Sequence, residues 1–137
     1  MAGFEVKAIG RVESPLTDAA SAPKQGDEGA PNAWLVFDGT VLDALEGLGP
    51  GDHVIVLTWL DRARRDVLSV HPRGDTSRPQ QGVFGTRSPH RPNPIGLHPV
   101  EIASIAGNRV LVRNLEALDG TPIVDVKPVL SPEVGER

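Results

Sequence analysis

Glycine and proline break this chain into short segments more strongly than any other feature of its sequence. They account for 15 and 13 of its 137 residues, without the period of a collagen repeat and without a long low-complexity tract. Long helices tolerate neither residue well, so frequent breaks between short apolar runs favour strands and turns over a helical bundle. With 39% hydrophobic and 23% charged residues, the chain has the composition of a folded domain. We therefore expect an all-β fold, a sandwich or a barrel.

The length fits one domain, which we place at residues 1–130, followed by a C-terminal tail at 131–137. No stretch approaches the roughly 20 apolar residues of a membrane helix, and the first residues lack a basic region followed by an apolar run. We expect a cytoplasmic protein without membrane contact. The absence of cysteine excludes disulfides and thiolate metal sites. The four histidines have no metal-ligand spacing, so no metal site is expected.

Patterns of apolar residues predict the individual elements. Alternation in the first residues and short β-branched runs elsewhere indicate strands, and 53–59 is the most apolar of them and the best candidate for a central strand. Two runs around a short glycine-containing loop predict a hairpin. Leucines at helical spacing between 42 and 48 predict one short helix. The predicted strands are 4–12, 34–37, 53–59, 67–70, 100–105, 109–114 and 123–127, the fifth and sixth forming the hairpin.

Residues 14–32 are predicted to form a long surface loop. They are rich in Pro, Gly, Ala and Asp and show no apolar periodicity. A loop of this length is unusual in a small domain, and such loops often close over a site.

The net charge of −4 conceals a basic segment. Residues 59–100 contain seven arginines and three acidic residues, a local charge of +4. An arginine fork pairs well with carboxylate or phosphate, so this segment favours an anionic ligand. For the run 62–66 the alternative is a solvated surface turn.

Three prolines within six residues stiffen the segment 88–94. Pro89, Pro92 and Pro94 each fix their own φ and push the preceding residue out of the helical region. A rigid loop lowers the entropy lost on ligand binding. Alternatively, the loop only rigidifies an edge of the fold, with its arginines capping nearby carbonyls. The side chains that it would hold in place are Arg87, Ser88, His90, Arg91 and Asn93.

Two motifs resemble signatures of one known family. The first is GVFGTRSPHRPNPIG at 82–96 and the second is LDGTPIVDVKP at 118–128. Together, and in this order, they resemble the TrmO family, also called TsaA-like or YaeB-like, of S-adenosylmethionine-dependent tRNA methyltransferases. The resemblance covers nearly the whole chain, with weaker similarity at 9–15 and 23–25. Departures are Gly85, His98 and Val129, where alanine, serine and tyrosine are usual.

The resemblance implies a TsaA-like fold, a small antiparallel β-barrel, which works as a homodimer with the cofactor near the subunit interface. It also implies methyl transfer to N6 of threonylcarbamoyladenosine 37 in tRNA, so the anticodon stem-loop is the expected partner. We expect a one-domain form, without the second, C-terminal domain of longer family members. Two alternatives stay open for this fold: a methyltransferase acting on a small molecule or another non-tRNA acceptor, and a non-catalytic S-adenosylmethionine-binding module.

The resemblance and the chemistry of the cofactor together suggest site residues. S-adenosylmethionine carries a carboxylate, an ammonium, hydroxyls and an adenine, so its site needs cations and acceptors. One of Arg87 and Arg91 is expected to pair with an anionic group of cofactor or substrate. The expected cofactor-binding residues are Gln25, Arg87, Ser88, Arg91, Asn93, Pro94, Ile95, Gly96, Leu118, Asp119, Gly120 and Thr121, and the expected substrate-binding residues are Arg91 and Lys127.

His90 and Asp125 are the candidate catalytic residues. A nitrogen flanked by a carbonyl is a poor nucleophile until its proton leaves, and either side chain offers a proton acceptor. Much of the catalysis can come from positioning alone. The alternatives are a turn-forming role for Asp119 and an ion pair of Asp125 with Lys127.

Overall fold

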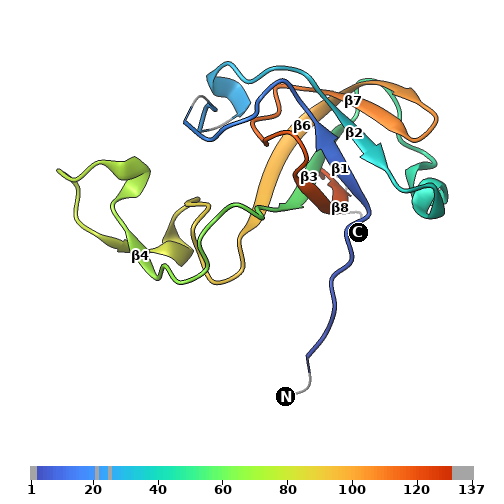
Figure 1. The fold of residues 1–137 in the computed structure, drawn as a ribbon. Helices are drawn as coiled ribbons and strands as arrows, with labels where there is room; N and C mark the ends of the chain where they lie inside the picture. Colours follow the sequence, from blue (N-terminus) through green and yellow to red (C-terminus); the bar gives the residue numbers. More distant parts are fainter. Residues whose placement is uncertain (1–2, 21, 25, 131–137) are drawn as a thin grey trace.

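Eight strands and four short 3-10 helices make up the described part of the chain (Figure 1). The computed structural model describes residues 3–20, 22–24 and 26–130, so Gln25 and the predicted tail at 131–137 lie outside it. No helix among the described residues is long and apolar enough to cross a membrane. The strands are β1 (Gly10–Glu13), β2 (Ala33–Phe37), β3 (His53–Trp59), β4 (Ser69–Val70), β5 (Gln81–Gly82), β6 (Ile95–Ala106), β7 (Arg109–Arg113) and β8 (Pro122–Pro128); the helices are η1 (Gly26–Glu28), η2 (Gly39–Leu45), η3 (Pro72–Gly74) and η4 (Val83–Gly85).

Six of the strands form a ring by antiparallel pairing. Their order is β1-β2-β7-β6-β3-β8, and β8 pairs back with β1. The longest ladder joins β3 to β6, from the pair His53–Glu101 to the pair Trp59–Ile95. The predicted mainly β class is therefore confirmed. So are the central strand at 53–59, which has the predicted bounds, and the hairpin, which is β6 and β7.

Branched aliphatic side chains fill the inside of the ring. Leu35, Val56, Ile102, Val112 and Ile123 are at most 1% exposed. Burial alternates along the first eight residues of β6, because successive residues of a strand face opposite sides. The inward-facing positions at the start of β6 are Gly96, His98 and Val100.

The first predicted strand is wrong over most of its length. β1 begins only at Gly10, and residues 3–8 form an extended arm that leaves the ring (Figure 1). Phe4 and Val6 are 84% and 63% exposed. The apolar alternation is present, but β2 ends at Phe37, opposite Gly10, and beyond Ile123 β8 pairs with β3 and no longer with β1. A strand needs a neighbour for its backbone groups, and the local pattern does not reveal where that neighbour stops.

The predicted short helix is present as a 3-10 helix, η2. The carboxylate of Asp38 caps it by accepting a hydrogen bond of 3.0 Å from the backbone N–H of Thr40. This bond holds the pKa of the Asp38 carboxyl below its ordinary value, because it stabilises the charged form. Tight glycine and proline spacing after Leu45 leaves no room for a longer helix.

The first half of β6 has a strand partner on one side only. β3 pairs with it throughout, whereas β7 begins opposite Glu101. The N–H of Ile102 donates to the carbonyl of Asp52, so even-numbered residues of β6 turn their backbone groups to β3 and odd-numbered residues turn theirs away. Pro99, which has no N–H, therefore removes no ladder bond. The backbone groups of Leu97 face this open edge.

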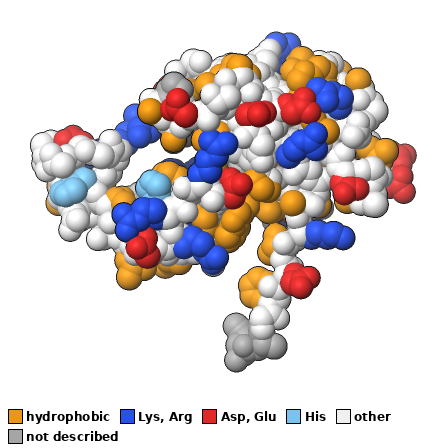
Figure 2. All heavy atoms as spheres, in the orientation of Figure 1, with side chains coloured by type: hydrophobic (Ala, Val, Ile, Leu, Met, Phe, Trp, Pro, Cys, Tyr) orange, Lys and Arg blue, Asp and Glu red, His pale blue; other side chains and the backbone are white. Residues whose placement is uncertain are grey.

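The connection 60–94 between β3 and β6 leaves the ring and forms a separate lobe. Within it, β4 and β5 make a two-stranded sheet. The base of the lobe is closed, because the N–H of Leu60 donates to Pro94 O at 2.8 Å and the N–H of Arg91 donates to Arg64 O at 3.1 Å. Figure 2 shows a hollow between the lobe and the ring.

Candidate functional site

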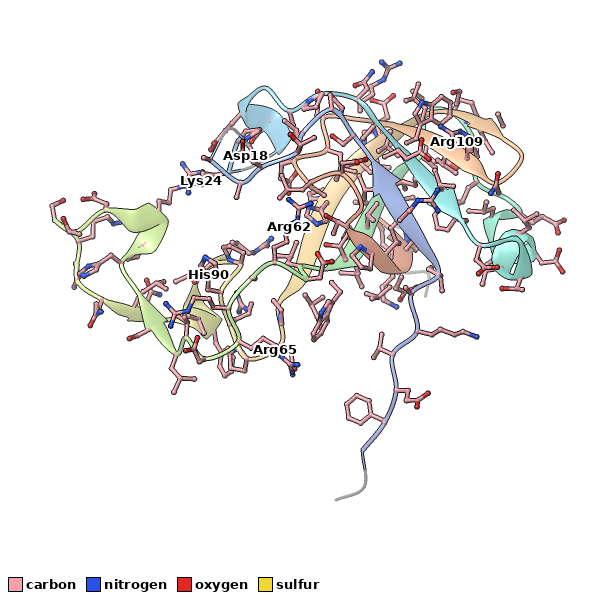
Figure 3. All side chains as sticks on the ribbon, in the orientation of Figure 1. Asp18, Lys24, Arg62, Arg65, His90 and Arg109 are labelled. Carbon is pink, nitrogen blue, oxygen red and sulfur yellow. The ribbon has the colours of Figure 1, made fainter. Side chains whose placement is uncertain are left out.

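A cavity of about 330 Å³ lies between the lobe, the loop 14–32 and the open edge of β6. Lys24, Arg62 and His90 lie around it and come from three separate parts of the chain (Figure 3). Besides polar groups, the walls contain the side chains of three leucines. The lining stretches are parts of 19–24, 60–63, 87–91, 95–98 and 116–121, and the leucines are Leu60, Leu97 and Leu118.

Hydrogen bonds fasten the loop 14–32 beside the cavity. The carboxylate of Asp119 accepts a bond of 3.0 Å from the backbone N–H of Ser14. The guanidinium of Arg62 donates to Thr17 O at 2.9 Å. The first residues of the predicted surface loop are therefore held against the turn before β8 and against the base of the lobe.

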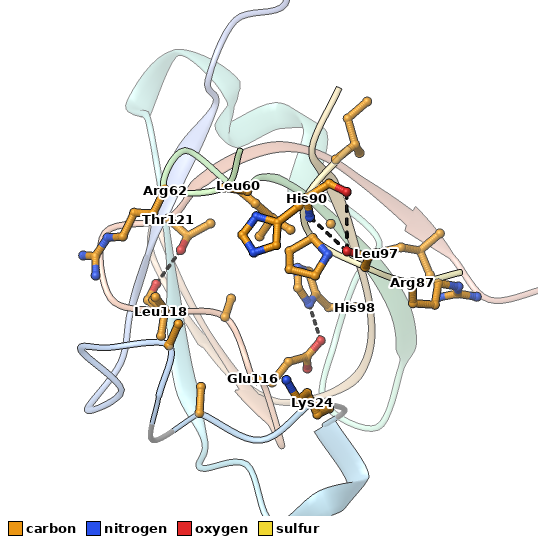
Figure 4. A pocket seen from close by; sticks show the side chains of 18 of the residues that line it. Lys24, Leu60, Arg62, Arg87, His90, Leu97, His98, Glu116, Leu118 and Thr121 are labelled. Carbon is orange, nitrogen blue, oxygen red and sulfur yellow. Dashed lines mark hydrogen bonds and ion pairs between the residues drawn. The ribbon is translucent and has the colours of Figure 1, made fainter. Parts of the chain in front are cut away.

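A buried chain of three polar side chains lies behind the cavity wall (Figure 4). The Nε2 atom of His98 is 2.7 Å from the hydroxyl of Thr58, and its Nδ1 atom is 2.6 Å from Oε1 of Glu116. Thr58 is fully buried, and the side chains of His98 and Glu116 are 5% and 16% exposed. A carboxylate only accepts, so Nδ1 carries a proton, and Nε2 shares a hydrogen bond with the Thr58 hydroxyl. Both ring nitrogens are thus engaged, and Glu116 is the member that reaches the cavity.

His90 presents a hydrogen-bond donor to the cavity. Its Nδ1 atom accepts a bond of 3.0 Å from the backbone N–H of Arg64, so the proton of the neutral ring sits on Nε2. Arg64 is held in turn by two bonds to Asp66, of 3.0 and 2.9 Å. These bonds keep the pKa of the Asp66 carboxyl below its ordinary value, and Asp66 stays charged at neutral pH. The predicted role of His90 as proton acceptor needs a free basic nitrogen, which this tautomer does not offer.

Two arginines stiffen the proline-rich segment, Arg91 from within it and Arg65 from outside. Arg91 donates from one nitrogen to the carbonyls of Thr86 and Ser88, both at 3.0 Å. Arg65 donates to Pro92 O and to the Asn93 side chain, and its guanidinium lies 5.1 Å from the centre of the Trp59 ring. Arg91 therefore caps carbonyls, which is the alternative role of the arginines in this segment.

Two cations at the cavity have no partner among the described residues. Lys24 and Arg87 line it, and neither makes a hydrogen bond or an ion pair with another residue of the described ranges. Unpaired cations beside a cavity favour an anionic ligand.

The structure brings eight of the predicted site residues to the cavity. The lining residues are Arg87, Ser88, His90, Arg91, Ile95, Gly96, Leu118 and Thr121. Asn93, Pro94, Asp119 and Gly120 neighbour this set in sequence but do not line the cavity, and Gln25 lies outside the described residues.

Asp125 and Lys127 have no place at this cavity. They lie on β8 and form an ion pair of 3.1 Å with each other. The ion-pair alternative is therefore the one that the structure shows. The predicted roles of Asp125 in proton transfer and of Lys127 in substrate binding find no support in this geometry.

Sequence reasoning missed His98 and Glu116. The strand was predicted to start at Val100, so the alternation that turns His98 inward was not extended to it. Glu116 follows the hairpin without a motif of its own. A signal existed in the alternation of 96, 98, 100 and 102, which places His98 on the same face as two core residues.

Among the described residues no group of His, Asp and Glu side chains is arranged to hold a metal ion.

Comparison with known proteins gives a consistent picture. A family model described as the tRNA-methyltransferase O N-terminal domain matches residues 11–133. The chain is 47% identical over 130 residues to an S-adenosyl-L-methionine-binding protein of Archaeoglobus fulgidus, covering 94% of this chain and 91% of that protein. It is similar to the crystal structure of TrmO from Pseudomonas aeruginosa, with a TM-score of 0.74 and 30% identity, covering 94% of this chain and 57% of that chain.

Proposed function

Because this chain belongs to the TrmO family, we propose that it methylates N6 of threonylcarbamoyladenosine 37 in tRNA, in the cytoplasm. At the coarser level the family and the relatives identify an S-adenosylmethionine-dependent methyltransferase, and S-adenosylmethionine is its cofactor. The chain spans 57% of the length of the solved TrmO chain, so the nucleoside acceptor is part of our proposal. We further propose that the closed six-stranded ring is the small β-barrel expected of this family, which the strand order supports.

One observation carries the proposal: a single cavity combines free cations, a histidine N–H donor, a carboxylate and apolar side chains. These groups fit S-adenosylmethionine, which is charged at one end and planar at the other. Leu60, Leu97 and Leu118 offer apolar surface to the adenosine. When bound, the cofactor supplies an electrophilic methyl group. The residues of the chain bind it, orient the acceptor and exclude water.

His90 is proposed to bind the carbamoyl oxygen of the acceptor. Its Nε2–H faces a cavity and its ring is fixed through Nδ1, so little reorganisation is needed when a carbonyl arrives. Holding the carbonyl orients the adjacent nitrogen toward the methyl group, and that nitrogen releases its proton to the solvent when it takes up the methyl. Positioning of this kind accounts for a large share of catalysis in displacement reactions.

Two variants test the role of His90. We expect His90→Ala to lower the rate of single-turnover methylation about 100-fold, as expected for loss of one positioned donor. His90→Gln, whose amide N–H takes the place of Nε2–H, should keep most of the rate. The assay uses tRNA carrying threonylcarbamoyladenosine, digestion to nucleosides and mass spectrometry. If both variants lose the rate equally, His90 acts as a base and the donor role is wrong.

The same assay tests the proposed function itself. Methylated product with the wild-type chain supports it. A cofactor-binding chain that yields no product from this tRNA would contradict it and favour a binding role, which the name of the Archaeoglobus relative describes.

Arg62 and Arg87 are proposed to contact tRNA phosphate. Both line the mouth of the cavity, whereas Arg109 lies on the other side of the ring (Figure 3). Arg109 stacks on Trp34 at 5.0 Å and pairs with Glu13. Each phosphate contact steepens the fall of affinity with salt.

Alanine variants of Arg62 or Arg87 should therefore reduce the slope of log affinity against log salt by about 1. Arg109→Ala, the matched control, should leave the slope unchanged. If the slope of log affinity against log salt is the same for all three variants, Arg62 and Arg87 do not contact tRNA phosphate.

We propose that two copies of the chain associate through the apolar edge of the lobe. Leu68 and Phe84 are 71% and 82% exposed, and hydrophobic side chains gather along the lower edge of the lobe in Figure 2. Exposed aromatic and aliphatic side chains of this size favour burial against a partner. Sedimentation velocity should show a dimer, and Leu68→Ser with Phe84→Ser should shift it to monomer. A wild-type monomer at micromolar concentration would contradict this.

A further inference from the structure

We propose that Lys24 and Glu116 together hold the α-amino-acid end of S-adenosylmethionine, and that His98 is the positioning residue for Glu116. In this arrangement the ammonium group of the cofactor meets Glu116 and its carboxylate meets Lys24. The proposal rests on the cofactor use described above and adds which end of the cavity receives which end of the cofactor.

Opposite charges meet at one end of the cavity. Figure 4 draws Lys24 and Glu116 there, and both line the cavity. The loop that carries Lys24 is tied to this end, because the backbone N–H of Leu115 donates to Pro31 O at 3.0 Å. Lys24 and Glu116 form no ion pair with each other, so each has its charge available.

The α-amino-acid group carries an ammonium and a carboxylate on one carbon. A site of a single sign attracts one of these charges and repels the other. A lysine and a glutamate side by side satisfy both. Arg62 and Arg87, together with the N–H of His90, bring positive or donor groups to the cavity, which Asp61 also lines, and these donors suit the acceptor.

The Glu116 carboxylate retains capacity for a ligand. Oε1 takes the bond from His98, and a carboxylate has about four acceptor positions. No described residue other than His98 is hydrogen-bonded to Glu116. Its side chain is 16% exposed, and the exposed part belongs to the cavity. Partial burial also strengthens a charged hydrogen bond relative to one in water.

His98 fixes where that carboxylate points. Its ring is held between Thr58 and Glu116, and a side chain at Gly96 would collide with it, since an added Cβ would lie 2.6 Å from Nε2. With both nitrogens engaged, His98 has no atom left to bind the ligand. It therefore acts on the cofactor through Glu116.

Binding of two ligands distinguishes loss of these specific contacts from a general disturbance of the binding site. S-adenosylhomocysteine carries the amino-acid group, whereas methylthioadenosine has a methyl group in its place. We expect Glu116→Gln and Lys24→Gln to weaken S-adenosylhomocysteine about tenfold to a hundredfold, as for the loss of a charged hydrogen bond. Methylthioadenosine affinity should stay within about twofold of wild type for both variants. Isothermal titration calorimetry on the full chain measures all six dissociation constants, those of wild type and of the two variants for each ligand.

Histidine variants test the positioning role. His98→Asn keeps an N–H donor near the place of Nδ1 and should preserve the preference for S-adenosylhomocysteine over methylthioadenosine. His98→Leu removes the donor and should reduce that preference about tenfold. A merely structural role would weaken both ligands together and leave the preference unchanged.

Three results would overturn the proposal. One is unchanged S-adenosylhomocysteine affinity in the Glu116 and Lys24 variants. Another is equal weakening of both ligands in these variants. The third is that Arg87→Ala alone abolishes the preference, which would place the cofactor carboxylate at the proline-rich segment. No acceptor enters these titrations, so a failure to methylate tRNA would count against the proposed function and not against this arrangement.

Discussion

Gly96→Ala is expected to lower the free energy of unfolding by about 2 kcal/mol and to weaken cofactor binding with it. A Cβ at this position would lie 2.4 Å from the Thr58 hydroxyl and 2.6 Å from His98 Nε2. Both neighbours are buried, so neither can move into solvent. The methyl group would have to push apart the hydrogen bond that joins them. For a chain of this size the melting temperature should fall by roughly 7 °C.

Gly49→Ala is the matched control for this substitution. Nothing lies within 4 Å of an added Cβ there, and Gly49 is not among the glycines with positive φ. We expect its melting temperature to stay within about 2 °C of wild type. If thermal unfolding followed by circular dichroism gave the two variants the same melting temperature, the close packing around Gly96 would not limit the stability of the fold.

Leu35→Ala should destabilise the fold more than Gly96→Ala does. Leu35 lies on β2, is 1% exposed and belongs to the core inside the ring. Its replacement removes apolar contacts and leaves a cavity that a closed ring of strands cannot readily collapse, at a cost of about 3 kcal/mol.

The same substitution at an exposed leucine provides the comparison. Leu42 on η2 is 40% exposed, so Leu42→Ala should cost less than about 1 kcal/mol. Urea unfolding at equilibrium gives both values. A loss below about 1 kcal/mol for Leu35→Ala would show that the interior of the ring is loosely packed.

Strands could be predicted where the local pattern is sufficient. The run 53–59 has β-branched residues on both faces, and β3 has these bounds because it is paired on both sides. The arm before β1 has an equally good alternation and forms no strand, since β2 ends opposite Gly10 and β8 continues beside β3. Pairing is a property of the whole fold, so a single segment does not report it.

The site could be predicted where one motif contains it. The proline-rich segment places Arg87, His90 and Arg91 at the cavity, and its stiffness follows from its prolines. The pair of His98 and Glu116 could not be predicted in this way, because the two residues are 18 positions apart and only the folded ring brings them together. The direction of Asp125 could not be predicted for a related reason: a motif does not show which way each side chain faces, and in the structure Asp125 pairs with Lys127.

The lobe has a consequence for how such proteins diversify. It is inserted between β3 and β6, two strands that are already neighbours, and hydrogen bonds at its base close it off from the ring. Substitutions and insertions within it leave the pairing of the ring untouched. Natural selection can therefore alter the side of the cavity that the lobe contributes, while the inherited ring continues to fold and to present the same β6 wall.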